Sequence, residues 1–147
     1  MSIETGPSAE SQIRDMVSEW VKAVRAKDVY GSTSDYGSDV VMFDLVNPLQ
    51  HIGSDAARKR AQEWFSSLES PIGYKIRDLK VTAGDDVAFC QSLNHVSGTT
   101  TQGKKIDMWW RATVCLRKSD GKWLVTHEHS SVPFDVESGK ASIDLKP

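Results

Sequence analysis

The side chains best suited to catalysis or ligand binding lie near the C-terminus, in a predicted β-hairpin. Two segments of alternating sequence, 106–118 and 123–132, flank the turn Ser119-Asp120-Gly121-Lys122, and an Asp-Gly pair between such segments is a strong hairpin signal. Ionisable side chains occupy positions where a plain sheet would carry apolar ones: Asp107, Arg111, His127, Glu128 and His129. So many ionisable groups on one hairpin of a small protein indicate that the hairpin lines a pocket.

One further carboxylate, Asp44, lies at the end of an earlier predicted strand, 39–46. A carboxylate held among apolar side chains has a raised pKa, because burial disfavours the charged form. Such a group can transfer protons at neutral pH. The alternative is a structural role, in which Asp44 caps or pairs with groups near Asn47.

The long strand of the hairpin has two faces of different character. Trp109, Arg111 and Thr113 share one face, because side chains alternate along a strand. If this face looks inward, Arg111 can pair with Glu128, since a buried arginine needs a carboxylate partner. Arg111 can instead bind a ligand carboxylate or carbonyl through its planar guanidinium group. The opposite face is more apolar and suits either a core or a dimer surface; it consists of Trp110, Ala112, Val114 and Leu116.

Two histidines alternate with Glu128 on the second strand of the hairpin. The spacing of His127 and His129 can present two imidazoles to a metal, but a third ligand would have to come from elsewhere. We therefore predict no metal site. A bulge can instead bring one imidazole, His129, to the pocket, because one extra residue exchanges the two faces of a strand.

Bulk properties narrow the class of protein. The 147 residues carry a net charge of -2 without a long basic run, which argues against nucleic acid as a partner. No apolar stretch approaches the roughly 20 residues that span a bilayer, and the N-terminus lacks the features of a signal peptide, so we expect no membrane partner and a cytoplasmic location. The two cysteines, Cys90 and Cys115, cannot form a disulfide framework and are expected to be reduced.

Periodicity predicts the elements that position these residues. Helical spacing indicates helices over 8–26 and 54–68, and the Gly- and Ser-rich segment 29–37 between them is either a weak helix or a loop. From residue 72 the period becomes two, with a phase slip near Arg77-Asp78 that indicates a bulge. Helices followed by a four-strand antiparallel meander predict an α+β fold. We expect one domain over 1–147, with 135–147 as a C-terminal tail.

Three segments resemble the NTF2-like superfamily, and within it the SnoaL-like and ketosteroid-isomerase-like group. They are DVVMFD at 39–44, IGSDAARKRAQEWF at 52–65 and RKSDGKWLVTHEHSSVPF at 117–134. The resemblance implies a cone, in which a strongly curved, mostly antiparallel sheet wraps N-terminal helices and a pocket opens between them. It also implies a homodimer formed through the sheet.

The resemblance also implies roles for single residues. Asp44 lies where the isomerases carry their general base. Trp20 and Thr113 lie where the isomerases carry two acidic hydrogen-bond donors; an indole N–H and a hydroxyl still donate hydrogen bonds, but this departure argues against steroid isomerisation. The same alignment implies that Trp109, Arg111 and Thr113 of the first hairpin strand face the pocket. On the second strand it implies that Thr126, Glu128 and Ser130 face it. Asn94, from the preceding strand, adds a polar contact.

Two functional hypotheses follow. The first is a cofactor-independent isomerase, dehydratase or cyclase that acts on a small hydrophobic or carbonyl-containing molecule. Asp44 would move the proton, and Arg111, Trp109 or Asn94 would orient the substrate oxygen. The second is a ligand-binding or dimeric assembly domain without chemistry.

Overall fold

A computed structural model describes residues 6–69 and 71–147. The N-terminal segment that is expected to lack signal-peptide features lies mostly outside these residues. Helices α1 (Ala9–Arg25), α2 (Val29–Thr33) and α3 (Ser54–Ser66) occupy the N-terminal half. The strands are β1 (Tyr36–Phe43), β2 (His51–Ile52), β3 (Gly73–Ala83), β4 (Val87–Thr99), β5 (Lys105–Ser119) and β6 (Lys122–Ser131).

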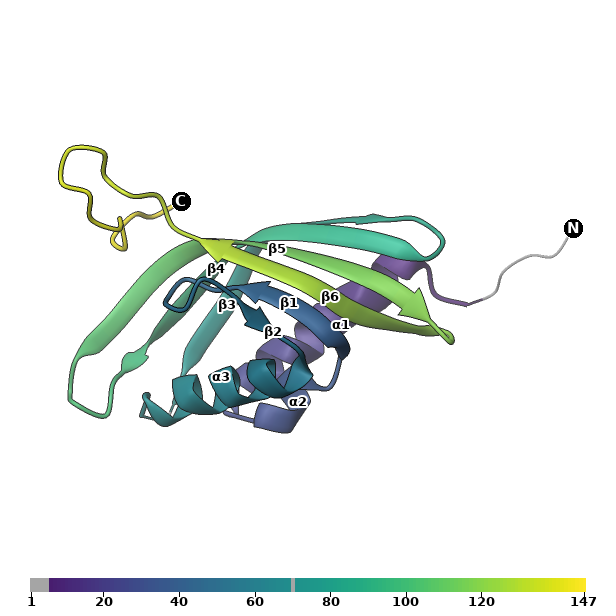
Figure 1. Ribbon diagram of the computed structural model, residues 1–147, viewed down its shortest axis with the longest axis horizontal. Helices are drawn as coiled ribbons and strands as arrows, with labels where there is room; N and C mark the ends of the chain where they lie inside the picture. Colours follow the sequence, from purple (N-terminus) through teal and green to yellow (C-terminus); the bar gives the residue numbers. More distant parts are fainter. Residues whose placement is uncertain (1–5, 70) are drawn as a thin grey trace, which may run out of the picture.

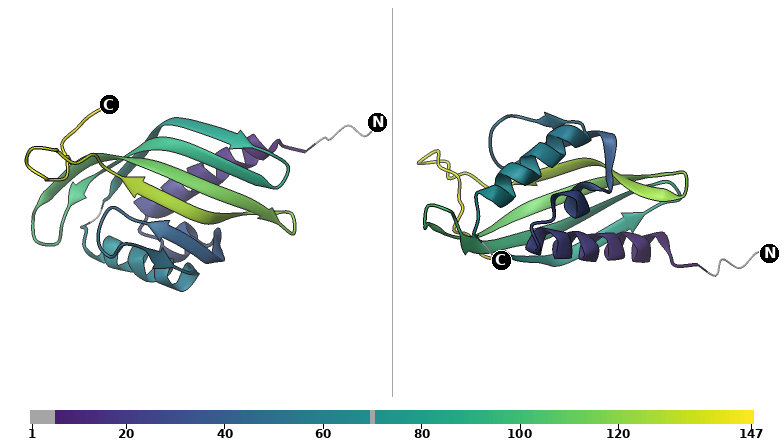
Figure 2. Two further views of the ribbon diagram at one scale, coloured as in Figure 1. Left: turned by 45° about the horizontal axis from the view of Figure 1, so that its top comes forward. Right: turned by 90° about the horizontal axis from the view of Figure 1, so that it is seen from below.

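The six strands form one curved sheet, with the helices packed on one of its faces (Figures 1 and 2). The strand order is β2-β1-β6-β5-β4-β3. Neighbouring strands run antiparallel except for β1 and β6, which are parallel. The predicted α+β architecture and the four-strand meander β3 to β6 are therefore confirmed.

Local sequence explains where the first elements begin. Ser8 caps α1 by accepting a hydrogen bond from the backbone N–H of Ser11 at 3.1 Å, as N-cap serines commonly do. Asp28 caps α2 in the same way, through the N–H of Gly31 at 2.9 Å. The weak segment after α1 thus contains one short helix, and its C-terminal part begins β1 three residues before the predicted strand.

The hairpin predicted at the Asp-Gly turn is confirmed between β5 and β6. Asp120 and Gly121 have φ angles of 51° and 78°, the left-handed pair that a type I′ turn requires. Residues after β6 fold back on themselves, with an isolated bridge between Phe134 and Ala141, and project beyond the end of the sheet (Figure 1).

Bulges in β3 and β6 bend the sheet. In β3 the register changes between Arg77 and Lys80, and Asp78 has a φ of 57°, so the bulge predicted at Arg77-Asp78 is confirmed. In β6, Leu116 pairs with Val125 while Cys115 pairs with His127. Thr126 is therefore the extra residue of a second bulge, which exchanges the two faces of the strand.

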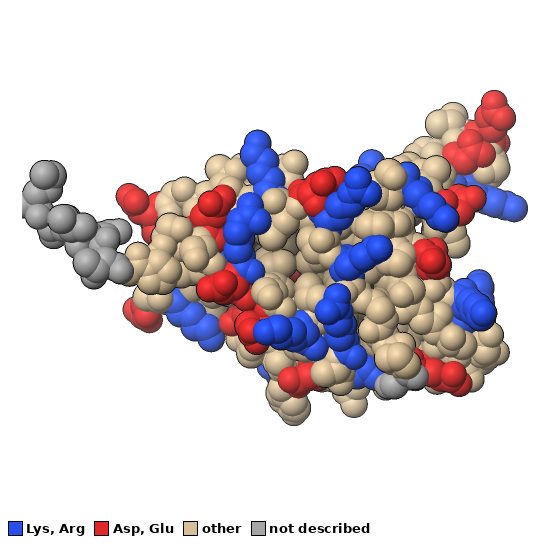
Figure 3. Space-filling view, turned by 180° about the vertical axis from the view of Figure 1, so that it is seen from behind, with Lys and Arg blue, Asp and Glu red and all other residues tan. Residues whose placement is uncertain are grey.

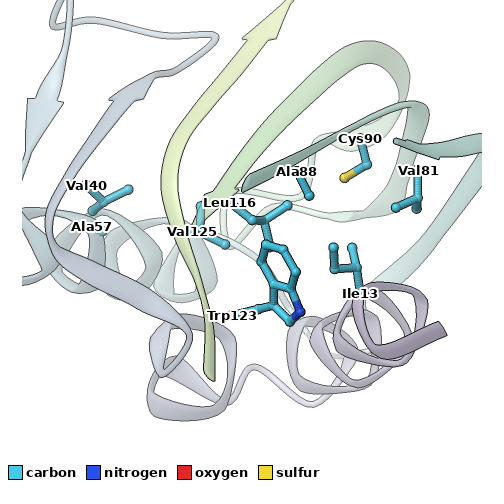
Figure 4. Packing of buried hydrophobic residues seen from close by; sticks show 9 residues of the cluster. All are labelled: Ile13, Val40, Ala57, Val81, Ala88, Cys90, Leu116, Trp123 and Val125. Carbon is cyan, nitrogen blue, oxygen red and sulfur yellow. The ribbon is translucent and has the colours of Figure 1, made fainter. Parts of the chain in front are cut away.

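The core lies between the helices and the concave face of the sheet. Figure 4 shows Ile13 of α1 directed toward the sheet beside the ring of Trp123, in a cluster that also contains Leu116 and Val125 of the β5–β6 hairpin. The indole N–H of Trp123 donates to Gln12 Oε1 at 3.0 Å, which satisfies the only polar atom of that buried side chain. Among the described residues, no helix is both long and apolar enough to cross a membrane.

Candidate functional site

A cavity of about 330 Å³ lies between the helices and the concave face of the sheet. Most of its wall is apolar, and aromatic side chains from α1, α3, β3 and β5 contribute much of that wall: Trp20, Trp64, Tyr74 and Trp110. The volume falls within the roughly 300–1,000 Å³ typical of small-molecule sites. A few polar side chains interrupt the apolar wall and form three separate groups.

The first polar group pairs Glu128 of β6 with Tyr36 of β1. The Tyr36 hydroxyl donates to Glu128 Oε1 at 2.9 Å. The bulge at Thr126 makes this contact possible, because Trp123 and Val125 are buried before the bulge. Without the extra residue, their alternation would place His127 rather than Glu128 on the cavity side.

The surroundings of Glu128 change its acidity. Burial raises the pKa of the Glu128 carboxyl to about 7; the hydrogen bond from Tyr36 acts in the opposite direction, and the negative charge of Asp44 raises the pKa further. Burial, followed by the proximity of Glu128, raises the pKa of Tyr36 well above 10.0. At neutral pH, Tyr36 therefore stays protonated while Glu128 can both take up and release a proton.

The second polar group is an ion pair between Asp44 and Arg60, both of which line the cavity. Arg60 Nε lies 2.7 Å from Asp44 Oδ2, and the other carboxylate oxygen accepts a 2.6 Å hydrogen bond from the N–H of Leu45. The Arg60 side chain is 20% exposed and the Asp44 side chain is 16% exposed. Both oxygens of Asp44 are thus engaged, in contrast to the apolar surroundings expected for it.

The third polar group links β4 to β3. Ser92 Oγ donates to Asn94 Oδ1 at 2.7 Å, and Asn94 Nδ2 donates to the Tyr74 hydroxyl oxygen at 2.7 Å. Asn94 is only 5% exposed and Tyr74 only 3%. The ring of Trp20 packs edge-on against Tyr74, with 5.1 Å between centroids.

Five of the eight predicted site residues line the cavity. They are Trp20, Asp44, Asn94, Thr113 and Glu128. Thr113 borders the cavity while remaining exposed, between the inward-facing Ala112 and Val114. The structure also brings Asp44 and Glu128 close enough for their charges to interact.

The expectation that Trp109, Arg111 and His129 face the pocket is wrong. None of the three lines the cavity, because Trp110 and Ala112 of β5 are buried in the core and strand alternation directs their neighbours outward. The alignment with the isomerases assigned the wrong face, whereas the apolar character of the Trp110 face indicated the correct one. The dimer surface considered for the Trp110 face is excluded for the same reason.

The three outward residues have their own surroundings on the convex face. Trp109 packs against His95 at 4.7 Å between ring centroids, and His129 packs against Phe43 at 5.4 Å. Arg111 is exposed. The suggested inner pair between Arg111 and Glu128 is therefore also wrong, because Glu128 faces the cavity and is bonded to Tyr36.

Sequence reasoning missed Tyr36, Arg60 and Tyr74. Arg60 follows Arg58 and Lys59 in a basic cluster, but its spacing from Ala57, Ala61 and Trp64 places it on their apolar stripe. Tyr74 alternates with Ile72 and Ile76, and a phenol within such an apolar series was the available signal. No local signal distinguished Tyr36.

Charges outside the cavity are mixed. Figure 3 shows basic and acidic side chains interspersed over one face of the molecule. Within residues 6–69 and 71–147, no three His, Cys, Asp or Glu side chains come together in a way that could hold a metal ion.

Comparisons with known proteins agree with this architecture. A family model for the SnoaL-like domain matches residues 13–135. An NTF2-like protein of unknown function from Pseudomonas putida is 36% identical, with 97% of this chain and 100% of that chain covered and a TM-score of 0.87. A search of curated proteins found no match.

More distant solved structures share the fold. A ketosteroid isomerase-like protein from Erwinia carotovora atroseptica is 21% identical, with 82% of this chain and 93% of that chain covered and a TM-score of 0.71. An NTF2-like protein with a cystatin-like fold from Novosphingobium aromaticivorans is 11% identical, with 88% and 85% covered and a TM-score of 0.69.

Proposed function

The chain belongs to the SnoaL-like domain family, and we propose that it binds a small hydrophobic carbonyl compound and catalyses a proton transfer on it, as an isomerase, dehydratase or cyclase does. One observation carries the proposal. Glu128 lies in an apolar cavity, bonded to Tyr36 at 2.9 Å, with its pKa raised by burial to about 7. A carboxyl group that titrates near the working pH is well suited to general acid–base catalysis.

The proposal assigns proton transfer to Glu128 rather than to Asp44. Asp44 is held by Arg60 and by the N–H of Leu45, so each of its two oxygens already accepts a hydrogen bond. In active sites, two carboxyl groups whose surroundings differ in this way commonly have different roles, one as the group that transfers the proton and the other as a charged group. Here burial would keep the pKa of Glu128 high, with a smaller contribution from the negative charge of Asp44, and Glu128 would exchange the proton.

The shape and chemistry of the cavity support a hydrophobic ligand. Aromatic side chains such as Trp20, Trp64 and Trp110 surround it, and an apolar wall with a few placed polar groups is typical of sites for organic molecules. No cofactor is part of the proposal, because the Glu128 carboxyl group can by itself take up a proton and release it again.

The proposal is tested by hydrogen exchange on a set of bicyclic and steroidal ketones in D₂O. NMR would follow the rate at which the α-hydrogens of each ketone are replaced by deuterium. We expect the protein to accelerate exchange, and Glu128→Gln to reduce that acceleration by about 10²–10⁴-fold, the usual contribution of a general base. Asp44→Asn should reduce it less, because Glu128 is retained.

A matched control is Glu63→Gln, on the exposed side of α3, which should exchange at the wild-type rate. If Glu128→Gln exchanges as fast as the wild type on a ketone that the protein accelerates, Glu128 is not the base. If ketones bind but none exchanges faster than in buffer, the protein binds its ligand without this chemistry.

A dimeric binding module without chemistry is the second proposal, and the convex face of the sheet favours it. Phe43 and Phe89 are 37% and 47% exposed, although large apolar side chains are usually covered. A second copy of the chain would cover them. Sedimentation of the wild type and of Phe89→Ser at micromolar concentration tests this proposal, and a wild-type monomer would contradict it.

A further inference from the structure

A chain of three polar residues crosses the sheet wall of the cavity, apart from Glu128 and Asp44. It begins at Ser92, continues through Asn94 and ends at the hydroxyl of Tyr74, with both hydrogen bonds 2.7 Å long. All three residues line the cavity. The proposed function does not use them, yet buried polar networks carry a cost unless every member is satisfied.

The directions of these hydrogen bonds leave one proton free. Ser92 donates to the amide oxygen of Asn94, which turns the amide nitrogen toward Tyr74. The amide nitrogen can only donate, so the Tyr74 oxygen accepts. In the described part of the chain, the Tyr74 hydroxyl donates to no other group, and its own hydrogen is therefore available to a guest in the cavity.

We propose that Tyr74 donates this hydrogen bond to the carbonyl oxygen of the substrate and that Asn94 and Ser92 position it for that purpose. This inference rests on the proposed function and specifies its substrate class. The substrate is a hydrophobic compound whose carbonyl oxygen gains negative charge during the reaction. Tyr74 would be a catalytic residue, because it touches the reacting group, and Asn94 and Ser92 would be positioning residues.

The chemical step balances without any further reactant. The Glu128 carboxylate takes the proton from the carbon next to the carbonyl, and the electrons of that C–H bond form a C=C bond. The electrons of the C=O double bond move onto oxygen, where the Tyr74 hydrogen bond stabilises the charge. The negative charge thus passes from Glu128 to the substrate oxygen, and protonated Glu128 then returns the proton to the same or another carbon.

The surroundings of Tyr74 suit the role of donor. Burial raises the pKa of Tyr74 well above 10.0, so the phenol keeps its proton, while the bond from Asn94 acts in the opposite direction. A donor that already accepts a hydrogen bond is polarised by it and donates more strongly. Donors fixed in advance where charge develops contribute more than donors that must reorient.

The test compares two ligands that differ by one hydroxyl group. The probe 4-nitro-1-naphthol carries an ionisable oxygen, and its neutral and ionised forms absorb at different wavelengths; 1-nitronaphthalene lacks that oxygen. Binding is measured in the Glu128→Gln background, which imitates the protonated carboxyl present when the substrate oxygen is charged. Affinity is followed by quenching of tryptophan fluorescence, and ionisation by absorbance.

We expect Tyr74→Phe to weaken binding of the ionised naphthol by about 10- to 100-fold, the value of a hydrogen bond to a charged group. Binding of 1-nitronaphthalene should change by less than about threefold, since the ring remains. Asn94→Leu should lower the ratio of the two affinities by a smaller factor, because Tyr74 keeps its hydroxyl but loses its orientation. Tyr30→Phe is the matched control, since Tyr30 is 73% exposed.

The possible failures are distinct. If 1-nitronaphthalene does not bind the wild type, the proposed hydrophobic-ligand function fails. If it binds and Tyr74→Phe leaves the ratio of the two affinities at its original value, the role of Tyr74 is overturned while the proposed function stands. Retained binding of 1-nitronaphthalene shows that each variant has kept the cavity.

Discussion

Replacing Glu128 with glutamine should remove a large part of the pH dependence of this protein's stability. Burial raises the pKa of Glu128 from 4.5 to about 7 in the folded chain. Between these two pH values, the folded state binds a proton that the unfolded state has already lost. The stabilising effect of this protonation is complete below pH 4.5 and disappears as the pH rises through about 7.

The magnitude follows from the two pKa values. A difference of one pKa unit corresponds to about 1.4 kcal/mol, so an increase from 4.5 to about 7 lowers the free energy of unfolding by about 3 kcal/mol between acidic and alkaline conditions. Glutamine does not titrate, and its amide oxygen can still accept the hydrogen bond from Tyr36. The variant should therefore gain about 3 kcal/mol relative to the wild type as the pH increases from 4 to 8.

The measurement is urea denaturation of both proteins at a series of pH values, with Glu63→Gln as the exposed control. The difference in unfolding free energy between wild type and Glu128→Gln should increase steadily through pH 5 to 7 and then level off. The control should show no such trend. A difference that stays constant within about 0.5 kcal/mol over this range would refute the burial of Glu128 as a titrating group.

Two other predictions concern the faces of β5 and the ion pair. Trp110→Ala should lower the free energy of unfolding by about 3 kcal/mol, because the side chain is 8% exposed in the core, while Trp109→Ala on the outer face should cost about 1 kcal/mol; equal losses on chemical denaturation would contradict the assigned faces. Asp44→Asn and Arg60→Met should each cost about 1–3 kcal/mol because the remaining partner is left partly buried. Their double-mutant cycle should show a coupling of about 1 kcal/mol or more, and additive effects would show that the 2.7 Å contact contributes nothing.

Apart from the two-residue strand β2, the order of the elements could be predicted from the sequence because its signals are local. The Asp120-Gly121 turn and the bulge at Asp78 each depend on the conformations available to a few neighbouring residues. The alternation that buries Trp110 on β5 was also visible. The outward placement of Arg111 shows that this apolar pattern is a better guide to the orientation of the strand than an alignment by position.

The polar groups of the site could be predicted only in part. Asp44, Asn94 and Glu128 were identified because ionisable or amide side chains stood out within strands. Their partners were not, because Tyr36 precedes Glu128 by 92 residues and Tyr74 precedes Asn94 by 20. Contacts between strands depend on the register of the whole sheet, which no short segment specifies.

The sequence by itself determined a helical layer, a meander and a hairpin rich in ionisable groups, because backbone propensity and apolar periodicity act over a few residues. Only the tertiary structure decided which of those groups enters the cavity. One extra residue at Thr126 turns Glu128 inward and His129 outward, and the parallel pairing of β1 with β6 brings Tyr36 to Glu128. The acidity of Glu128 follows from these placements, since it depends on what surrounds the carboxyl group and not on which residues precede it in the chain.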